Sequence, residues 1–347
     1  MELLSTLGPS SLNKTVLKKL ELLGVSLFRI NLSHTEIKDL EETIDLIRSY
    51  TNVPICIDTE GAQIRTRLKK KANLEEGEII NIFFDYEKNP NFVNFYPKVS
   101  INQFKIGDLV FIDFNAVVVE VLKVEKNSIQ VIVINEGSIY SNKGVSINKS
   151  INLNPFTEKD ISAFKITSKK KIKNYALSFC NKKEDVLNIK KLVPKGAKII
   201  AKIENKSGFS NCKEICQTAD SILIDRGDLS KEYNIEDIPL IQKEITKIAK
   251  NVKTKIFVAT NFLESMINNP FPNRAEINDI YNTLIDGVDG LVLAAETAIG
   301  KYPVESASII KRIFKSFKTS LKKKPAFTKT SKIKKFDEII IDKFAES

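Results

Sequence analysis

Along most of this chain, short apolar runs alternate with longer segments whose apolar residues recur at helical spacing. The predicted strands are Leu3–Leu7, Ser26–Asn31, Val53–Asp58, Tyr175–Phe179, Lys198–Ile203, Ser221–Asp225, Lys255–Thr260 and Gly290–Ala294. A helix is expected after each strand, and eight such units are the number in a closed (β/α)8 TIM barrel of the α/β class. An open doubly wound sheet is the alternative. It is disfavoured because no G-x-G-x-x-G fingerprint follows the first strand.

A segment with a different residue pattern interrupts this alternation. From about Arg67 to Leu153 there is no helical pattern, but short Ile, Val and Phe runs are separated by turns. This pattern predicts a small β domain inserted after the third strand. The expected domains are therefore a barrel from residues 1–66 and 154–318, an insertion from residues 67–153, and a basic tail from residues 319–347.

The expected helices follow from apolar spacing and from cap residues. Their ranges are Leu12–Leu23, Glu36–Ser49, a helix that opens at Thr157, Lys183–Leu192, Gly208–Thr218, Ile238–Asn251, Arg274–Asp286 and Val304–Phe317.

The net charge of +11 resembles that of a nucleic-acid-binding protein, but the charge is concentrated in one place. Residues 311–335 hold eleven Lys and Arg residues and no acid, so that the other 43 basic residues balance the 43 acidic ones. A solvated charged face is the simpler interpretation, and nucleic-acid binding is disfavoured. There is no basic leader and no membrane-length apolar run, so we expect a cytoplasmic protein without a membrane partner.

Cysteine and histidine are too sparse for several kinds of site. Cys56, Cys180, Cys212 and Cys216 show no C-x-x-C spacing. Cys212 and Cys216 lie one helical turn apart, which suits a metal, but no other soft ligands accompany them. Free thiols in a reducing cytosol are expected. With His34 as the single histidine, a zinc site or a Ser–His triad has little support.

Polar residues collect where the predicted strands end, which is the pole where barrel enzymes place their active site. They are Arg29, Asn31, Ser33, Asp58, Thr59, Arg65, Lys202, Glu204, Arg226, Asp228, Thr260, Glu296 and Thr297. The two clusters that end the fifth and sixth strands, taken alone, fit two structural salt bridges as well as they fit a site. Six strands that all end in this way would be costly to bury without a ligand.

These residue types divide by chemistry. Glu204 and Asp228 can hold Mg²⁺ or Mn²⁺ through carboxylate oxygens, and Lys202 can neutralise an oxyanion beside them. Arg29 and Arg65 can grip a phosphoryl group. Four further oxygen donors suit a large monovalent cation, namely Asn31, Ser33, Asp58 and Thr59. The set indicates metal-assisted phosphoryl transfer or enolate chemistry.

Nine stretches resemble the pyruvate kinase family and occur in the family's order over about residues 4–318. They are residues 5–11 (Ser-Thr-Leu-Gly-Pro-Ser-Ser), 29–34 (Arg-Ile-Asn-Leu-Ser-His), 58–61 with 64–66 (Asp-Thr-Glu-Gly, Ile-Arg-Thr), 143–145 (Lys-Gly-Val), 201–205 (Ala-Lys-Ile-Glu-Asn), 226–229 (Arg-Gly-Asp-Leu), 259–260 with 263–266 (Ala-Thr, Leu-Glu-Ser-Met), 272–276 (Pro-Asn-Arg-Ala-Glu), and 296–298 with 300–303 (Glu-Thr-Ala, Gly-Lys-Tyr-Pro). The resemblance implies a TIM barrel whose inserted small β barrel closes over the cleft as a lid.

The resemblance also implies a role for each matching residue. Arg29 and Arg65 hold the phosphoryl group, Lys202 stabilises the enolate, and Glu204 and Asp228 bind Mg²⁺ or Mn²⁺. The substrate carboxylate contacts Gly227, Asp228 and Thr260, and Thr260 belongs to the route that protonates the enolate. Asn31, Ser33, Asp58 and Thr59 are K⁺ ligands. The nucleotide-binding positions are Asn31, Ser33, His34, Arg65 and Lys143, although His34 also fits a cap residue before the second helix.

Several positions depart from the family pattern. Glu60, Ala62 and Gln63 stand where the family usually has Lys, Pro and Glu, and Asp225 replaces a small residue beside the metal. Three further replacements are Asp113-Phe114-Asn115 for a lid Asp-Asp-Gly, Asn261-Phe262 for Gln-Met, and Ala294-Ala295 for Ser-Gly. A glutamate at position 63 goes with K⁺ dependence in the family and a lysine replaces the ion. Gln63 therefore predicts K⁺ stimulation with weak affinity.

The family's C-terminal domain has no counterpart in this sequence. The helix-like run Phe336–Phe344 is expected to be its stub or an adaptor that covers barrel surface. Regulation by sugar phosphates and a four-subunit assembly are therefore not expected, while a homodimer through the barrels stays open.

The leading functional hypothesis is phosphoryl transfer from phosphoenolpyruvate to ADP, which gives pyruvate and ATP in glycolysis. One alternative is a relative that handles phosphoenolpyruvate or pyruvate with another phosphoryl acceptor. The other is a non-catalytic scaffold that makes contacts through its basic tail.

Overall fold

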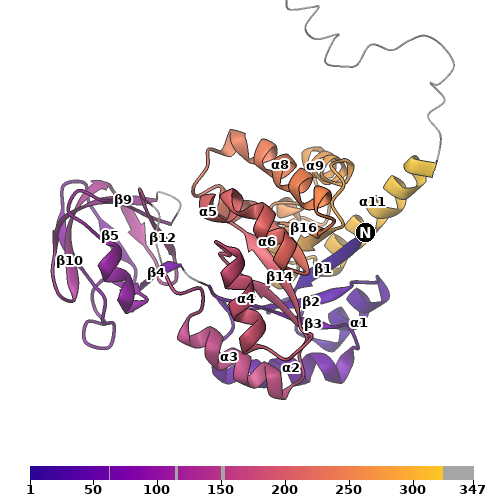
Figure 1. Cartoon of the computed structure of the whole chain (residues 1–347), viewed down its shortest axis with the longest axis horizontal. Helices are drawn as coiled ribbons and strands as arrows, with labels where there is room; N and C mark the ends of the chain where they lie inside the picture. Colours follow the sequence, from indigo (N-terminus) through magenta and orange to yellow (C-terminus); the bar gives the residue numbers. More distant parts are fainter. Residues whose placement is uncertain (62, 114–115, 150–152, 323–347) are drawn as a thin grey trace, which may run out of the picture.

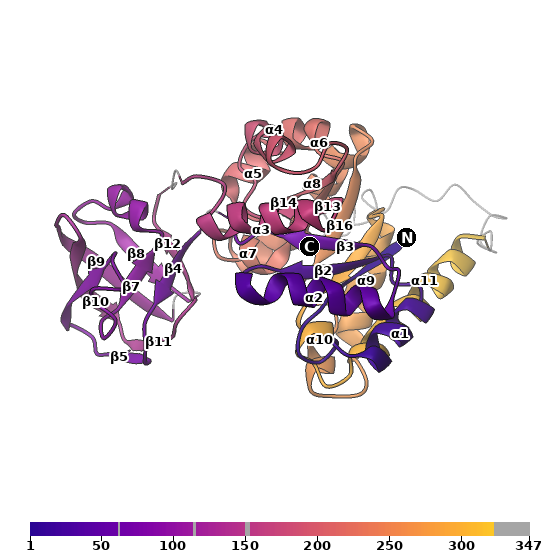
Figure 2. The same ribbon diagram turned by 90° about the horizontal axis from the view of Figure 1, so that it is seen from below.

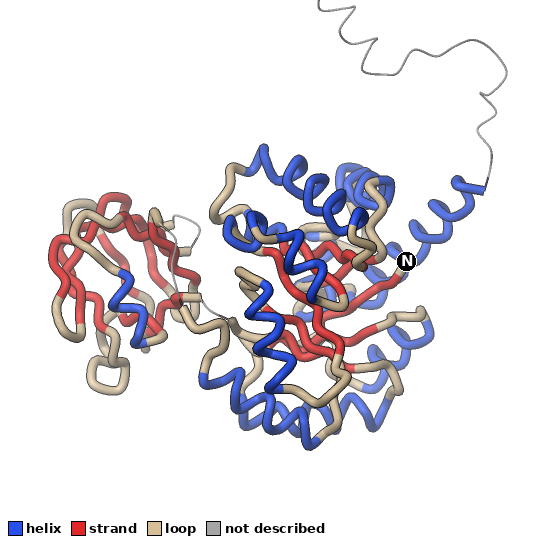
Figure 3. The backbone as a smooth tube through the Cα atoms, in the orientation of Figure 1, coloured by secondary structure: helices blue, strands red, loops and turns tan. Residues whose placement is uncertain are grey.

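The computed structural model describes residues 1–61, 63–113, 116–149 and 153–322. Eight parallel strands of these residues close into a barrel in the order β1-β17-β16-β15-β14-β13-β3-β2. Their bounds are β1 Glu2–Thr6, β2 Leu27–Asn31, β3 Ile55–Asp58, β13 Asn174–Leu177, β14 Lys198–Ile203, β15 Ser221–Asp225, β16 Lys255–Ala259 and β17 Gly290–Leu293. The predicted (β/α)8 barrel is confirmed, and Figure 3 shows its helices outside the strands.

The α-helices alternate with these strands along the chain, with short extra turns at several strand ends (Figure 1). They are α1 Lys14–Leu22, α2 Ile37–Tyr50, α3 Glu158–Lys169, α4 Lys183–Leu192, α5 Lys206–Ser210, α6 Cys212–Thr218, α7 Arg226–Leu229, α8 Ile238–Asn251, α9 Arg274–Ile285, α10 Ala295–Ala298 and α11 Pro303–Lys322. Short 3₁₀ turns are η1 Lys98–Gln103, η2 Ile235–Asp237 and η3 Glu264–Ile267. Among the described residues, none of the helices combines the length and the apolar character that spanning a bilayer requires.

Cap residues decide where the helices begin. The predicted start at Thr157 is confirmed, because Thr157 and Asp160 form a reciprocal capping box at α3. The first helix was expected from Leu12, but it begins at Lys14 since the Asn13 side chain accepts the Val16 N–H. The expected helix Gly208–Thr218 is instead the two helices α5 and α6, which meet at Asn211.

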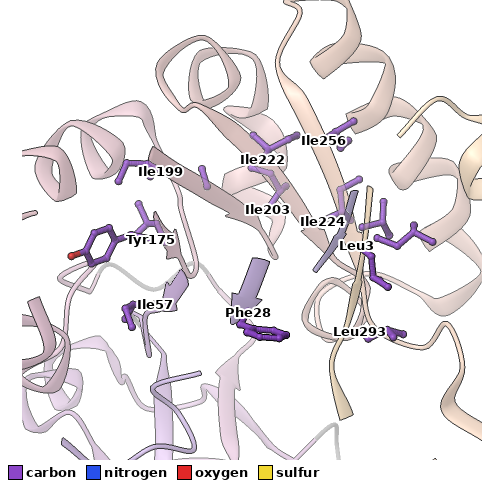
Figure 4. Close-up of a cluster of buried hydrophobic side chains, with 14 of the residues drawn as sticks. Leu3, Phe28, Ile57, Tyr175, Ile199, Ile203, Ile222, Ile224, Ile256 and Leu293 are labelled. Carbon is purple, nitrogen blue, oxygen red and sulfur yellow. The ribbon is translucent and has the colours of Figure 1, made fainter. Parts of the chain in front are cut away.

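Successive residues of a strand point to opposite sides, so the barrel strands have one apolar layer outside them and another inside the barrel. Alternate residues face the surrounding helices, and Figure 4 shows ten of them labelled, from Leu3 to Leu293. The intervening residues fill the barrel interior, where the buried set is Leu4, Cys56, Ala176, Ile200, Leu223, Phe257, Ala259 and Val292. This interior layer forms the floor on which the strand-end residues stand.

A second closed barrel with seven strands lies to one side of the first, as Figure 2 shows clearly. Its order is β10-β6-β7-β4-β12-β8-β9, and β5 and β11 form a separate pair. The bounds are β4 Ile64–Arg67, β5 Ala72–Leu74, β6 Ile79–Phe83, β7 Asn94–Tyr96, β8 Leu109–Ile112, β9 Val117–Val124, β10 Ser128–Asn135, β11 Gly137–Ile139 and β12 Gly144–Ile147. It has its own apolar core.

The two barrels are joined close to the strand ends of the larger one. The insertion was expected to start at residue 67, whereas Ile64–Arg67 already pairs within the small barrel as β4. Residues 319–322 of the expected tail continue α11. Ala62, Phe114 and Asn115, the helix expected at Phe336–Phe344 and the rest of the tail lie outside the described residues.

Candidate active site at the strand ends

A polar layer stands directly on the apolar interior of the barrel. Five residues of this layer are buried, and each lies two residues after an apolar residue that faces the barrel interior. They are Arg29, Asp58, Ser178, Lys202 and Asp225. The two-residue period of a strand therefore turns these side chains inward, toward the barrel axis. Parallel strands bring their carboxyl ends to one pole, so residues that are far apart in sequence meet there.

Arg29 and Asp58 form a buried ion pair across neighbouring strands. The Nε and Nη2 groups of Arg29 donate to Asp58 Oδ2 at 2.9 and 2.6 Å, and Nη1 donates to Thr6 Oγ1 at 2.9 Å. Burial alone would raise the pKa of Asp58, but the charges of Arg29 and then Lys202 outweigh burial and lower it. Asp58 is therefore a carboxylate at neutral pH.

Lys202 lies at the centre of the polar layer. Its Nζ is 2.7 Å from Glu204 Oε1, 3.4 Å from Asp58 Oδ1 and 3.7 Å from Asp225 Oδ2, and it donates to Ser178 Oγ at 3.1 Å. Burial opposes the charge of the ammonium group, but the three carboxylates outweigh burial and raise the pKa of Lys202. The side chain is therefore a fixed cation at the base of the site.

Glu204, Asp225 and Asp228 each offer a carboxylate oxygen, and these oxygens lie within 4.8 Å of one another. Glu204 Oε2 also accepts the Phe179 N–H at 2.5 Å. Burial, followed by the charges of Asp228 and Asp225, raises the pKa of Glu204 to about 8 despite the lowering effect of Lys202. Three carboxyl groups this close together, two of them buried, are what a hard divalent cation would neutralise.

Thr260 follows β16 in a left-handed backbone conformation, with φ of 74°. This conformation is costly for a β-branched residue and is concentrated at functional sites. Thr260 Oγ1 accepts the Gly227 N–H at 3.0 Å, and it can donate its proton to Asp225 Oδ1 at 3.3 Å or to Ala259 O at 2.5 Å. The hydroxyl thus faces the first turn of α7.

The four candidate K⁺ ligands occupy the ends of two neighbouring strands, since Asn31 and Asp58 are paired in register. Asn31 Oδ1 accepts the Ser33 N–H at 2.9 Å, and Thr59 Oγ1 accepts the Ser178 N–H at 2.9 Å. Asn31 Oδ1 and Thr59 Oγ1 each keep a lone pair beyond this one hydrogen bond. Their chemistry therefore allows a shared monovalent cation.

Arg65 connects the two barrels. Its Nη1 donates to Asn142 O at 3.2 Å and its Nη2 to Ser33 Oγ at 3.3 Å. Within the described residues, the buried Arg65 Nε and Gln63 Oε1 have no hydrogen-bond partner. Buried polar groups are normally paired, so a donor left open at this junction fits an anionic ligand.

The two remaining nucleotide candidates are placed differently. His34 follows the end of β2, where desolvation and then the charges of Arg65 and Arg29 lower the pKa of its imidazole. Lys143 belongs to the small barrel, where its Nζ lies 2.9 Å from Asp113 Oδ2. Its charge is thus engaged by its own domain.

A cleft of about 560 Å³ lies between the two barrels. The larger barrel contributes Glu204, Asp228 and Lys231 to its lining, and the smaller contributes Val145 and Ser146. Lys231 also forms an ion pair with Asp228. The divalent-cation candidates therefore open onto a space that both domains enclose.

The strand-end residues are not all directed into this site. Glu296 accepts the backbone N–H groups of Leu263 and Ala294, and Thr297 Oγ1 donates to Thr6 O at 2.8 Å. Arg226 binds Asp279 through two hydrogen bonds. These three residues brace loops within the barrel.

Sequence reasoning missed Ser178, which contacts Lys202 and can donate to Thr59 O at 2.7 Å or to Asp58 Oδ1 at 3.3 Å. The signal that would have identified it is its position, two residues after the inward Ala176 on β13.

Comparison with known protein families places this geometry in context. The sequence model described as the pyruvate kinase barrel domain matches residues 1–307. The chain is 34% identical to the pyruvate kinase of Thermotoga maritima over 332 residues, which cover 92% of this chain and 71% of the relative. The pyruvate kinase of Methanocaldococcus jannaschii is 36% identical over 321 residues, 90% of this chain and 68% of the relative. The pyruvate kinase of Aeropyrum pernix is 32% identical over 345 residues, which cover 95% of this chain and 74% of the relative.

Proposed function

This chain belongs to the pyruvate kinase family and is a phosphotransferase, and from that premise we propose how its own residues carry out the reaction. The substrates are phosphoenolpyruvate and ADP, and the products are pyruvate and ATP. The observation that carries the proposal is the buried Lys202 ammonium group, 2.7 Å from Glu204 and next to the Arg29–Asp58 pair at the same pole.

Arg29 and Arg65 hold the phosphoryl group that is transferred. A guanidinium has five N–H donors, and the hydrogen bonds of Arg29 to Asp58 and Thr6 use three of them. Among the residues that the structure describes, none accepts a hydrogen bond from the buried Arg65 Nε–H at the junction of the two barrels. Together they supply positive charge from two directions to a group that carries negative charge throughout the transfer.

Lys202 stabilises the enolate oxygen that forms when the phosphoryl group leaves. Its charge is held in place by carboxylates, so that no reorganisation is needed as negative charge develops. The substrate carboxylate meets Gly227 and Asp228 at the start of α7, and for Gly227 this requires its N–H to exchange Thr260 Oγ1 for the substrate. Thr260 lies beside them, where its hydroxyl can pass a proton toward the enolate carbon.

Glu204 and Asp228 fit Mg²⁺ or Mn²⁺, because hard cations prefer carboxylate oxygens and these two lie with Asp225 in a negatively charged cluster. When bound there, the cation would polarise the phosphoryl oxygens and offset developing charge. Asn31, Ser33, Asp58 and Thr59 would hold K⁺, and Gln63 supplies no charge beside it. We therefore expect K⁺ to raise the rate with weak affinity. A rate that is flat against K⁺ at fixed ionic strength contradicts this.

His34 and Lys143, together with Arg65, are proposed to contact the nucleotide. For Lys143 this requires its ammonium group to exchange Asp113 for a phosphate. The free cysteines among the described residues support a reducing, cytoplasmic location. Pairing of two copies through the larger barrel is also proposed, and sedimentation at two protein concentrations tests it.

The decisive experiment measures pyruvate formed from phosphoenolpyruvate with Mg²⁺ and K⁺, with and without ADP. ADP-dependent turnover that is lost in Lys202→Met, but kept in Lys198→Met on the exposed start of the same strand, supports the proposal. Binding of phosphoenolpyruvate without ADP-dependent turnover would instead indicate another phosphoryl acceptor. If phosphoenolpyruvate does not bind at all, the scaffold hypothesis gains and the assignment is wrong.

A further inference from the structure

Asp225 is the last residue of β15, and it faces the barrel interior two residues after the inward Leu223. Its carboxylate is buried between Lys202 on β14 and Thr260, which follows β16. Oδ1 lies 3.3 Å from Thr260 Oγ1, and Oδ2 lies 3.7 Å from Lys202 Nζ. A small residue at this position would leave this space uncharged, so the aspartate changes the electrostatics of the site in this chain.

The nearby cations are already committed to other carboxylates. The Arg29 guanidinium is bound to Asp58, and the Lys231 ammonium group is bound to Asp228. Lys202 lies 1.0 Å closer to Glu204 than to Asp225, as the two distances of 2.7 and 3.7 Å show.

Counted over the described residues of this cluster, three cations therefore face four carboxylates. A buried carboxylate without full compensation is strongly unfavourable. The cluster thus holds one carboxyl group more than its three cations can pair with before any ligand binds.

We propose that Asp225 is a third carboxylate of the divalent-cation site, which gives the free enzyme a tighter hold on Mg²⁺ or Mn²⁺ than Glu204 and Asp228 would give alone. The proposal rests on the metal assignment made above. Its geometric basis is that one oxygen from each of the three carboxylates lies within 4.8 Å of the others. Mg²⁺ sites with one or two carboxylates rely on substrate phosphates to complete them, whereas a third protein carboxylate strengthens binding before substrate arrives.

A consequence for the substrate follows from charge alone. Phosphoenolpyruvate is an anion, so without a divalent cation the extra carboxylate repels it from Lys202 and Thr260. Removal of Asp225 should therefore have opposite effects in two conditions. It should weaken cation binding to the free enzyme, and it should strengthen phosphoenolpyruvate binding when no divalent cation is present.

The experiment titrates Mn²⁺ into the substrate-free enzyme and follows the signal of free Mn²⁺ by electron paramagnetic resonance. The variants are Asp225→Ala and the isosteric Asp225→Asn, which preserves packing if the alanine variant folds poorly. Glu204→Gln tests the metal assignment itself, and Asp39→Asn, an exposed carboxylate on α2, is the matched control. We expect both Asp225 variants to weaken Mn²⁺ binding at least tenfold, Glu204→Gln to weaken it further, and the control to match the wild type.

Phosphoenolpyruvate binding is then measured calorimetrically in a chelator. Tighter binding by Asp225→Asn than by the wild type is expected. If the Asp225 variants bind Mn²⁺ like the wild type while Glu204→Gln does not, the inference is overturned and the metal assignment stands. If Glu204→Gln also binds like the wild type, the site lies elsewhere and both are overturned.

Discussion

The ammonium nitrogen of Lys202 lies 2.7 Å from Glu204 Oε1, although the two residues share one strand and are separated only by Ile203. Residues two apart on a strand face the same side, so both point into the barrel while Ile203 joins the outer core. The cation is thereby fixed beside the carboxylate that is proposed to bind metal. A contact between residues two apart in sequence therefore places a positive and a negative group side by side at the strand ends.

Ser178 is predicted to position Lys202. In Ser178→Ala the lysine loses the acceptor that lies 3.1 Å from its Nζ, and a hydrogen bond to a charged group contributes about 1.5–3 kcal/mol. We expect kcat for pyruvate formation to fall by about tenfold or more, while KM changes little. Steady-state kinetics test this.

Ser210→Ala, at an exposed position of α5, should leave kcat unchanged and serves as the control. Ser178→Thr keeps a hydroxyl and should recover part of the rate. An unchanged kcat in Ser178→Ala would show that the carboxylates alone hold Lys202.

Asp58 is predicted to be a major contributor to stability. Asp58→Asn leaves Arg29 and Lys202 buried without this carboxylate, and breaking a buried pair costs about 3–5 kcal/mol. Chemical denaturation measures the loss in the free energy of unfolding. Asp85→Asn breaks an exposed pair with Lys98 instead and should cost about 0–1 kcal/mol.

The same variant predicts a pH dependence. The folded pKa of Asp58 is lowered because Arg29 and Lys202 outweigh burial. The contribution of Asp58 to the free energy of unfolding is therefore complete above the pKa of the unfolded chain, about 3.9. It is lost as the pH falls through the lower pKa of the folded protein. The stability difference between wild type and Asp58→Asn should be constant from neutral pH to about pH 4 and shrink below it. A difference that grows toward acid would refute the sign.

Gly61 is predicted to be required for the loop after β3. Its φ is 76°, and an added Cβ would lie 2.7 Å from Ser178 Cβ. Gly61→Ala should therefore cost about 1–2 kcal/mol for the backbone and about 1–3 kcal/mol more for the overlap. Gly196→Ala is the control, because its φ is 80° but nothing lies within 4 Å. Equal losses of stability in the two variants would contradict the close approach.

Thr260 is predicted to act through its hydroxyl. Thr260→Ser keeps the group that accepts the Gly227 N–H and should retain most activity. Thr260→Ala removes it, and kcat should fall by about 10²-fold, within the usual range for a proton-transfer group. Both variants remove the β-branch at a φ of 74°, so neither should lower the melting temperature through strain. Equal activity of the two variants would remove Thr260 from the proton route.

The main features of the larger barrel could be predicted from sequence because strand and helix periods are local. The strands β14 and β15 and the helices α4 and α8 have the predicted bounds, since strong apolar periodicity ends at clear polar positions. Several short strands of the small barrel, including β7 and β12, could not be predicted, because three or four residues carry too little pattern. The break at Asn211 was missed because Phe209, Cys212 and Cys216 keep helical spacing across it.

The inward direction of the strand-end side chains and their gathering at one pole can be read from the sequence, because both follow from the two-residue period of a strand and from parallel strands. Which of these side chains come into contact depends on the folded barrel. Lys202 reaches Asp58, Ser178 and Asp225 from three other strands, and those contacts depend on the register in which eight strands close. That register is set by packing of the entire barrel, which no local stretch of sequence encodes.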